Sequence, residues 1–303
     1  MLRQTRRKFL KVAGTAGFGI YEVLVKTKIS NGSNNNENRS VTQRKKKVLS
    51  KIRIAQVKVY PEKGNMRANH KSLMNVLEDV ENHHDVDVVV TPEGFLDGYV
   101  STEKSVTKDD MVKYAINPQT SRYTQAVSVW AKRNKAWIFY GCTRKAANGV
   151  FNTALIYNRK GNMVGMYDKL HLQTHDYKYI PGKHLNVYES DFGIFGVMIC
   201  ADRRWPETTR TLTLKGARVI FNPTYGMHGD LNLCMMRTRS YENGIFIIFT
   251  HPGQSLITDP KGDVVVNNRD KTKTYSVTEI DLSKALADKS GHIIDRRPDV
   301  YRL

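Results

Sequence analysis

From about residue 50 onward, two patterns of apolar and polar positions alternate along the chain. Short apolar or alternating runs indicate strands, and segments whose apolar residues recur every three or four positions indicate helices. Strands are predicted at residues 53–60, 86–90, 136–142, 151–157, 163–167, 194–199 and 217–222, with more strands between 245 and 280. Helices are predicted around Leu73–Val80, Ala126–Ala131, Glu207–Lys215 and Leu231–Glu242. This alternation, with a hairpin-rich second half, predicts an α/β (mixed α+β) fold of mixed sheets covered by helices.

Turn residues separate several of these strands. Asn158–Gly161 lies between two apolar runs and predicts a hairpin. Pro260-Lys261-Gly262 and Asn267-Asn268 predict turns between later strands, and a long irregular loop follows Asn222.

The first 47 residues have a different composition from the rest. Residues 1–29 begin with Thr5-Arg6-Arg7-Lys8-Phe9-Leu10-Lys11 and a weakly apolar stretch, which resembles a twin-arginine export signal. Glu22 interrupts the apolar stretch, so a basic amphipathic start is the alternative. Residues 30–47 are polar and aperiodic, which predicts a disordered linker before a folded domain at 48–303. Export would place the protein in the periplasm, with the export machinery as a partner; otherwise it would be cytoplasmic.

Charge and cysteine content limit the class of protein. The chain of 303 residues has a net charge of +19. Residues 1–50 hold 12 Lys and Arg against 2 Glu, so they supply +10 of that charge. A basic chain is compatible with nucleic-acid or membrane binding, but no motif that reads nucleic acid accompanies the charge, and we expect no such partner. Three cysteines do not form a disulfide framework, so the fold must depend on its core.

Three predicted strands are followed by chemically reactive side chains. Glu93 follows residues 86–90, Lys169 follows 163–167, and Cys200 ends the apolar run 194–199. In open α/β folds, loops at the carboxyl ends of strands gather side chains around one crevice. A thiol that attacks a carbonyl, a carboxylate that moves protons and a cation that stabilises an oxyanion together suit acyl transfer from nitrogen.

Cys200 lies on a predicted strand-to-helix elbow. Arg203 and Arg204 follow it, and Pro206 suits the first turn of the next helix. Cationic neighbours and a helix N-terminus favour the thiolate, so we expect a nucleophilic cysteine. The alternative is a small core hydrophobe beside a solvated turn.

The contexts TPEGF, YDKLHL and ICADRRWPE, in this order, resemble the nitrilase superfamily of carbon–nitrogen hydrolases. The resemblance covers about residues 50–303, including Arg239–Asn243 and Arg296–Tyr301. It implies a four-layer α-β-β-α sandwich, a Glu-Lys-Cys triad, no cofactor and at least a homodimer. By this resemblance Glu93 is the general base, Lys169 the oxyanion-stabilising cation and Cys200 the nucleophile, with the N–H of Ala201 in the oxyanion hole. Asp176 stands where many members carry a second glutamate before Pro-Gly.

The segment after Cys200 is most similar to the N-carbamoyl-D-amino acid amidohydrolases. The resemblance implies that positions Arg203, Arg204, His171 and His175 hold a substrate carboxylate, and a planar guanidinium suits such a contact. We therefore predict hydrolysis of a small N-carbamoyl amino acid or a related amide through a thioester. The alternatives are a general aliphatic amidase or nitrilase, an inactive binding protein of the same fold, and a basic anion-binding protein.

A zinc hydrolase is a further alternative. His171, His175 and His184 could ligate zinc if their segment were helical, but it is predicted as strand and loop and lacks a zinc-protease pattern. We therefore expect no metal. Cys142 and Cys234 have no motif around them, and we interpret them as packing residues.

Overall fold

The computed structural model describes residues 48–285 and 292–301. The predicted export signal and linker lie outside the described residues. The helices in the described ranges include none that is both long and apolar enough to cross a membrane.

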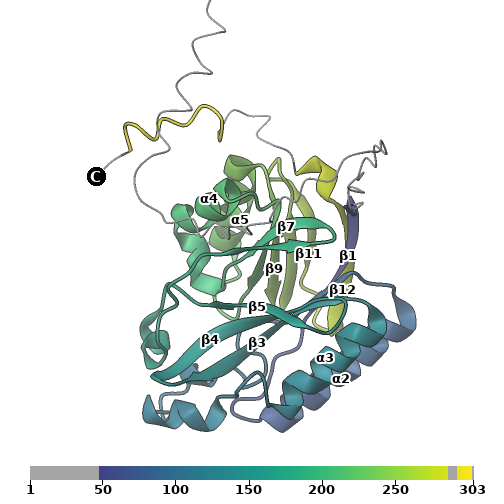
Figure 1. Cartoon of the computed structure of the whole chain (residues 1–303), viewed down its shortest axis with the longest axis vertical. Helices are drawn as coiled ribbons and strands as arrows, with labels where there is room; N and C mark the ends of the chain where they lie inside the picture. Colours follow the sequence, from purple (N-terminus) through teal and green to yellow (C-terminus); the bar gives the residue numbers. More distant parts are fainter. Residues whose placement is uncertain (1–47, 286–291, 302–303) are drawn as a thin grey trace, which may run out of the picture. The chain divides into compact units, whose positions relative to one another are not determined.

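In the described residues, twelve strands form two mixed six-stranded sheets. The two sheets lie face to face in Figure 1. The first sheet has the order β12-β1-β2-β3-β4-β5, in which β1, β2 and β3 are parallel. The second has the order β11-β10-β9-β8-β7-β6, in which β7, β8 and β9 are parallel. The first sheet comprises β1 (Lys51–Val57), β2 (Val88–Val90), β3 (Trp137–Ala146), β4 (Gly149–Tyr157), β5 (Met163–Asp168) and β12 (Tyr275–Asp281). The second comprises β6 (Val187–Ser190), β7 (Gly193–Val197), β8 (Val219–Pro223), β9 (Phe246–His251), β10 (Gln254–Thr258) and β11 (Val264–Asn268).

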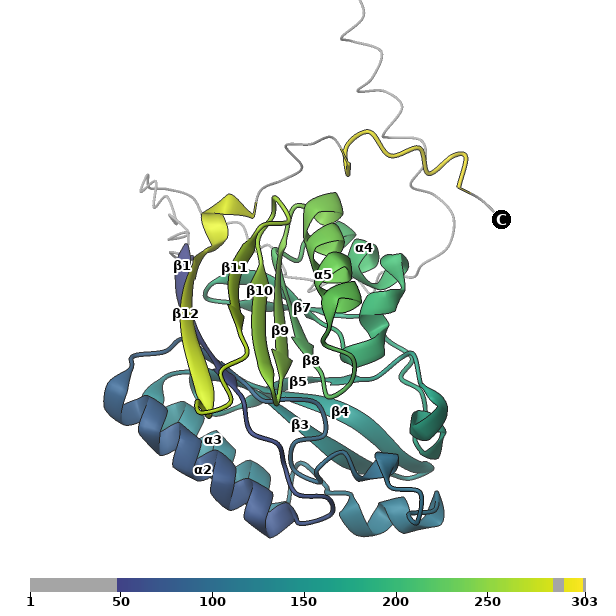
Figure 2. The same cartoon turned by 180° about the vertical axis from the view of Figure 1, so that it is seen from behind.

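Two helices cover the outer face of each sheet (Figures 1 and 2). The first sheet is covered by α2 (Met66–His83) and α3 (Arg122–Asn134), and the second by α4 (Pro206–Leu214) and α5 (Asp230–Asn243). The side chain of Asn65 caps α2 by accepting from the N–H of Ala68, and Pro206 occupies the first turn of α4, where a missing N–H costs nothing.

Apolar side chains fill the three spaces between these four layers. The central cluster joins the inner faces of both sheets, where Phe139 stacks on Phe221 with ring centroids 4.2 Å apart. One outer cluster packs the α2 stripe, including Leu73 and Leu77, against the first sheet, and another packs Leu212 and neighbouring residues against the second. The predicted α-β-β-α sandwich is therefore confirmed.

The structure differs from the predicted elements at the edges of the sheets. Asn267 and Asn268, predicted as a turn, are the last residues of β11, and the chain turns after them. Strand β6 was not predicted, because it is a short, partly exposed edge strand without a clear apolar alternation. Neither difference affects the segments that follow β2, β5 and β7.

Candidate active site

The segments after β2, β5 and β7 bring Glu93, Lys169 and Cys200 into one electrostatically coupled cluster. Glu93 lies three residues after β2, Lys169 directly follows β5, and Cys200 opens a 3-10 turn at Cys200–Arg204. The charges of Glu93 and Lys169 both act on the Cys200 thiol. The sequence-predicted strand ends thus meet, although β2 and β5 belong to one sheet and β7 to the other.

Lys169 is the centre of this cluster. Its Nζ lies 2.8 Å from Glu93 Oε1 and 2.5 Å from Asp176 Oδ2, and all three side chains are fully buried. Burial alone would lower the pKa of Lys169, but Glu93, Cys200 and Asp176 outweigh burial and raise that pKa, so the amine stays protonated. The backbone of Lys169 is held by Asn152, whose carbonyl accepts its N–H at 2.9 Å.

Glu93 is oriented through both carboxylate oxygens. Oε1 accepts hydrogen bonds from Lys169 and from Asn152 Nδ2, the latter at 2.9 Å. Oε2 accepts from the backbone N–H of Tyr225 at 3.0 Å. A carboxylate held this way has a fixed position from which to exchange a proton with a neighbouring group.

Asp176 lies in the 3-10 turn Thr174–Lys178, and its carboxylate contacts Lys169. Its Oδ1 accepts from Tyr99 OH at 2.6 Å, and its Oδ2 also accepts from the N–H of Gln173 at 3.1 Å. The residue expected in place of a second glutamate therefore does contact the lysine.

Cys200 is buried, with 7% of its surface exposed, and has a left-handed backbone with φ of +47°. Such a conformation costs a non-glycine residue on the order of 1–3 kcal/mol and is often found at functional sites. Burial, and then the charge of Glu93, raise the pKa of the Cys200 thiol, while Lys169 and Arg203 oppose this rise without cancelling it. The expectation that cationic neighbours make Cys200 a ready thiolate is therefore wrong for the free protein, because desolvation outweighs them.

Asp202 supports the elbow that carries Cys200. Its carboxylate accepts from the N–H of Ile199 at 2.9 Å and from Tyr167 OH at 2.7 Å. It also accepts from the backbone N–H of His171 and contacts His171 Nδ1 at 2.8 Å. The His171 ring stacks on Trp205 with centroids 4.0 Å apart. The structure thus places His171 beneath the elbow and not among the residues that line the adjoining cavity.

Arg239 supports the same elbow from α5. Its Nε and Nη2 donate to the carbonyl oxygens of Arg203 and Arg204 at 3.2 and 3.1 Å, and its Nη1 pairs with Glu242 at 3.0 Å. The segment Arg239–Asn243 thus helps to fix the backbone of the elbow that carries Cys200.

A cavity of about 290 Å³ opens beside Cys200. Six of its lining residues bear on the chemistry: Tyr99, His175, Cys200, Ala201, Arg203 and Arg204. Ala201, the expected oxyanion-hole residue, is therefore next to the cavity. A space of this size suits a small ligand.

The two arginines of the cavity differ sharply in environment. Arg203 is 1% exposed; its Nε donates to Asn232 Oδ1 and its Nη2 to the carbonyl of Met227, both at 2.6 Å. Within the described residues, Arg203 Nη1 has no acceptor in hydrogen-bonding geometry. Arg204 is exposed and donates to Gln173 Oε1 at 2.6 Å. Of these two arginines, only Arg203 thus has a buried guanidinium nitrogen without a protein acceptor in hydrogen-bonding geometry, and its guanidinium also acts on the Cys200 thiol.

The remaining histidines and cysteines have separate surroundings. His175 lines the cavity and contacts Tyr99, whereas His184 is exposed. No group of three or more His, Cys, Asp or Glu side chains suited to a metal occurs in residues 48–285 and 292–301. Cys142 packs in the core between the first sheet and its helices. Cys234 is exposed on α5, so its interpretation as a packing residue is wrong.

Sequence reasoning missed Tyr99, Asn152 and Tyr225, which orient the cluster. Tyr99 and Asn152 carry no local signal of their own, and Tyr225 contributes a backbone group. Two glycines offered indirect evidence: a Cβ on Gly141 would lie 2.4 Å from the carbonyl oxygen of Pro92, and one on Gly182 would lie 2.2 Å from that of Asp168. Both glycines therefore allow the chain to pack tightly against the residues that precede Glu93 and Lys169.

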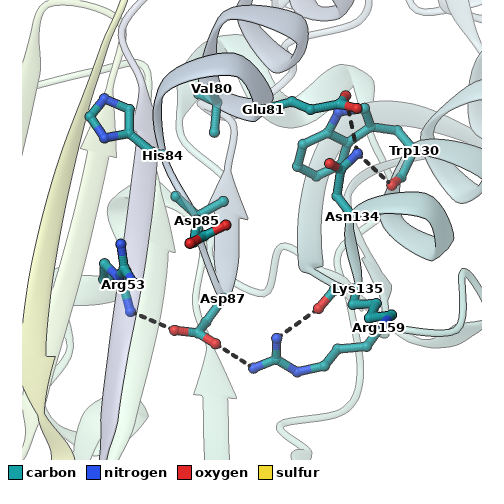
Figure 3. Close-up of a pocket in the computed structure, with 11 residues that line it drawn as sticks. Arg53, Val80, Glu81, His84, Asp85, Asp87, Trp130, Asn134, Lys135 and Arg159 are labelled. Carbon is teal, nitrogen blue, oxygen red and sulfur yellow. Dashed lines mark hydrogen bonds and ion pairs between the residues drawn. The ribbon is translucent and has the colours of Figure 1, made fainter.

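A second cavity, of about 260 Å³, lies at the opposite end of β2 (Figure 3). Asp87, which precedes β2 by one residue, accepts from the backbone N–H of Arg53 at 2.8 Å and from Arg159 Nη2 at 2.7 Å. Arg159 also donates to the carbonyl of Lys135 at 2.7 Å. Figure 3 shows these groups joining β1, β2 and the turn after α3.

Comparison with known proteins gives one concordant result. The family model described as carbon-nitrogen hydrolase matches residues 51–289. A nitrilase of Pyrococcus abyssi is 27% identical over 82% of this chain and 99% of its own length. An N-carbamoylputrescine amidase of Solanum lycopersicum is 29% identical over 52% of this chain and 65% of its own length. The crystal structure of Saccharomyces cerevisiae Nit3 superposes with a TM-score of 0.69 at 23% identity, covering 78% of this chain and 93% of Nit3.

Proposed function

We propose that this chain, which belongs to the carbon–nitrogen hydrolase family of the nitrilase superfamily, cleaves a small carboxylate-bearing amide through a thioester on Cys200. The family and its amidase and nitrilase relatives make it a hydrolytic enzyme that acts on amides. The observation that carries the proposed mechanism is the buried cluster in which Lys169 joins Glu93 and Asp176 beside the Cys200 thiol.

The chemistry follows from the protonation of this cluster. Because burial raises the pKa of Cys200, the thiol enters the reaction protonated, and Glu93 takes its proton as Sγ bonds to the amide carbon. The ammonium of Lys169 and the N–H of Ala201 stabilise the oxyanion. Glu93 then returns the proton to the leaving nitrogen as the C–N bond breaks.

The same groups serve the second half of the reaction. Glu93 takes a proton from water, the water oxygen attacks the thioester carbon, and the C–S bond breaks as Cys200 recovers its proton. For an N-carbamoyl amino acid whose ureido NH₂ leaves first as ammonia, hydrolysis of the thioester gives the N-carboxy amino acid, which loses carbon dioxide to leave the free amino acid. Asp176 contributes by balancing the charge of Lys169 and holding it in place.

Arg203 supports a substrate with a carboxylate. Arg203 lines the cavity, and its buried Nη1 has no protein acceptor in hydrogen-bonding geometry, although the guanidinium also acts on the Cys200 thiol. A carboxylate that reached Nη1 would satisfy a donor that is otherwise costly to bury. The similarity to a protein named N-carbamoylputrescine amidase supports a substrate with a carbamoyl group. We therefore propose a small N-carbamoyl amino acid as the substrate, with a general aliphatic amide or nitrile as the alternative.

A release-of-ammonia assay tests both levels of this proposal. Cys200→Ala should reduce hydrolysis of every substrate by a factor on the order of 10⁴ or more, because the nucleophile is gone. Full activity in that variant would overturn the thioester mechanism. The substrate screen should include N-carbamoyl amino acids, their uncharged methyl esters, simple amides and nitriles.

Arg203→Ala should lower kcat/KM for the carboxylate substrates by about 30- to 1000-fold, because a charged hydrogen bond to the substrate is lost. The same variant should affect the methyl esters little. Arg204→Ala is the matched control, since Arg204 lines the same cavity but is exposed and already bonded to Gln173. Equal losses on acids and esters in Arg203→Ala would mean that Arg203 holds the elbow and that the enzyme is a general amidase.

A further inference from the structure

The hydroxyl of Tyr99 lies at the meeting point of three functional side chains. It is 2.6 Å from Asp176 Oδ1, 3.2 Å from Lys169 Nζ and 2.9 Å from His175 Nε2. Tyr99 itself is 1% exposed. It is therefore the only residue in the described ranges that is hydrogen-bonded to both the buried cluster and His175.

The protons of this junction can be assigned from valence. A phenol has one O–H proton and accepts through its lone pairs. The short contact with the Asp176 carboxylate uses that proton, because a carboxylate only accepts. Lys169 and His175 must then both donate to the hydroxyl oxygen, so His175 carries a proton on Nε2.

The backbone conformation of Tyr99 and the contacts around it fix the position of its hydroxyl. Its φ is +53°, a left-handed conformation that costs a non-glycine residue on the order of 1–3 kcal/mol. Its ring packs against the rings of Tyr225 and His175, each with a centroid-to-centroid distance of 5.4 Å. Lys63 Nζ donates to the carbonyl oxygen of Tyr99 at 3.2 Å. The surrounding contacts thus hold the hydroxyl between Asp176 and Lys169.

This position matters because two carboxylates share one lysine. Asp176 places Oδ2 on Lys169, and Tyr99 satisfies Oδ1. Without the phenol, Oδ1 would lack its donor in a buried site, and Lys169 would lose one of the three side-chain contacts that define its position. His175 in turn supports the phenol from the cavity side, where its side chain is 42% exposed.

We propose that His175 is a positioning residue, which acts on Lys169 and Asp176 through the hydroxyl of Tyr99 and does not hold the substrate carboxylate. This inference rests on the proposed function. It assigns to His175 a role that differs from the one implied by the family resemblance, and it makes Tyr99 the residue through which that role is exerted.

A double-mutant cycle on the full chain tests the proposal. The variants are His175→Ala, His175→Gln, Tyr99→Phe and the double variant Tyr99→Phe/His175→Ala, each assayed on an N-carbamoyl amino acid and on a neutral amide. His175→Ala should lower kcat about 10-fold on both substrates with little change in KM. His175→Gln, whose amide nitrogen donates from a similar place, should recover most of that loss. Once Tyr99 is Phe, His175→Ala should change kcat less than about twofold.

Two results would overturn the proposal. A rise in KM for the carboxylate substrate alone would make His175 a substrate-binding residue. Multiplicative losses in the double variant would mean that His175 and Tyr99 act independently. Tyr179→Phe is the control for removing a buried phenol, since that hydroxyl contacts Thr143 and not Lys169; it should leave kcat unchanged.

The proposed function and this inference fail in different ways. Activity retained by Cys200→Ala would remove the mechanism on which the inference rests. A requirement for Cys200 combined with multiplicative losses would leave the mechanism intact and remove only the role of His175. Melting temperatures of all variants separate loss of positioning from loss of fold.

Discussion

The two ends of β2 use a carboxylate in opposite ways. At the amino end, Asp87 is one quarter exposed and pairs with Arg159 while it accepts a backbone N–H from β1 (Figure 3). At the carboxyl end, Glu93 is buried and shares Lys169 with Asp176. Asp87 has a complete set of partners near water, whereas the buried cluster has one lysine for two carboxylates. That difference separates a structural ion pair from a candidate catalytic site.

The physical reason is the cost of desolvation. A partly solvated ion pair is inexpensive to form and stabilises the fold by about 0–1 kcal/mol. A buried cluster with an uncompensated charge costs several kcal/mol to assemble and is weak evidence for stability. The shifted pKa values of Cys200 and Lys169 are consequences of this crowding, and perturbed groups of this kind concentrate at functional sites.

Replacing the buried carboxylate should have the largest effect. We expect Glu93→Gln to lower kcat/KM about 1000-fold, because the side chain keeps its shape but no longer accepts a proton. Steady-state kinetics and a thermal melt would measure the two properties together. If Glu93→Gln stayed active, Glu93 would not be the general base, and its carboxylate would be structural like that of Asp87.

Asp97 should make stability depend on pH. It lies in the loop between Glu93 and Tyr99, and burial raises its pKa from 3.8 to about 7, although its hydrogen bond with Thr143 opposes the rise. A raised folded-state pKa stabilises the protein below the unfolded value and loses that contribution as pH rises toward 7. The rise corresponds to at most about 4 kcal/mol, and we expect about 2–4 kcal/mol.

Asp97→Asn should remove this dependence. The variant should gain stability relative to the wild-type chain as pH rises from about 4 to about 7, and no further above that, as followed by urea unfolding at each pH. Parallel stability curves for the two proteins would show that Asp97 has the same pKa in the folded and the unfolded chain, so that burial does not raise it.

The smallest effect is expected at the amino end of β2. Asp87→Asn should lower the free energy of unfolding by about 1 kcal/mol, because the side chain is partly exposed and Arg159 retains Asp191 and the carbonyl of Lys135. Its kcat/KM should stay within about twofold of the wild type. A large loss of activity would show that the two ends are coupled through β2.

Much of the fold was predictable because its signals are local. The β-branched run before Glu93 and the apolar run before Cys200 predicted β2 and β7, and the apolar periodicity around Leu73 predicted α2. Edge strand β6 escaped prediction because its stability comes from pairing with β7 and not from its own pattern.

The candidate site divides in the same way. Motif context placed Glu93, Lys169 and Cys200 at strand ends, and the positions of Arg203 and Arg204 followed directly. The sequence did not distinguish the buried Arg203 from the exposed Arg204, nor did it indicate that His171 contacts Asp202 while His175 faces Tyr99.

The sequence by itself determined most of the order of strands and helices and the identity of the residues that follow the strands, and its resemblance to a family implied the four-layer class. The tertiary structure alone decided which of them share a buried site and in what protonation state. Hydrophobic periodicity is read within a few neighbouring residues. Burial, which outweighs the lowering effect of Arg203 on the pKa of Cys200, depends instead on residues from both sheets packing around one thiol.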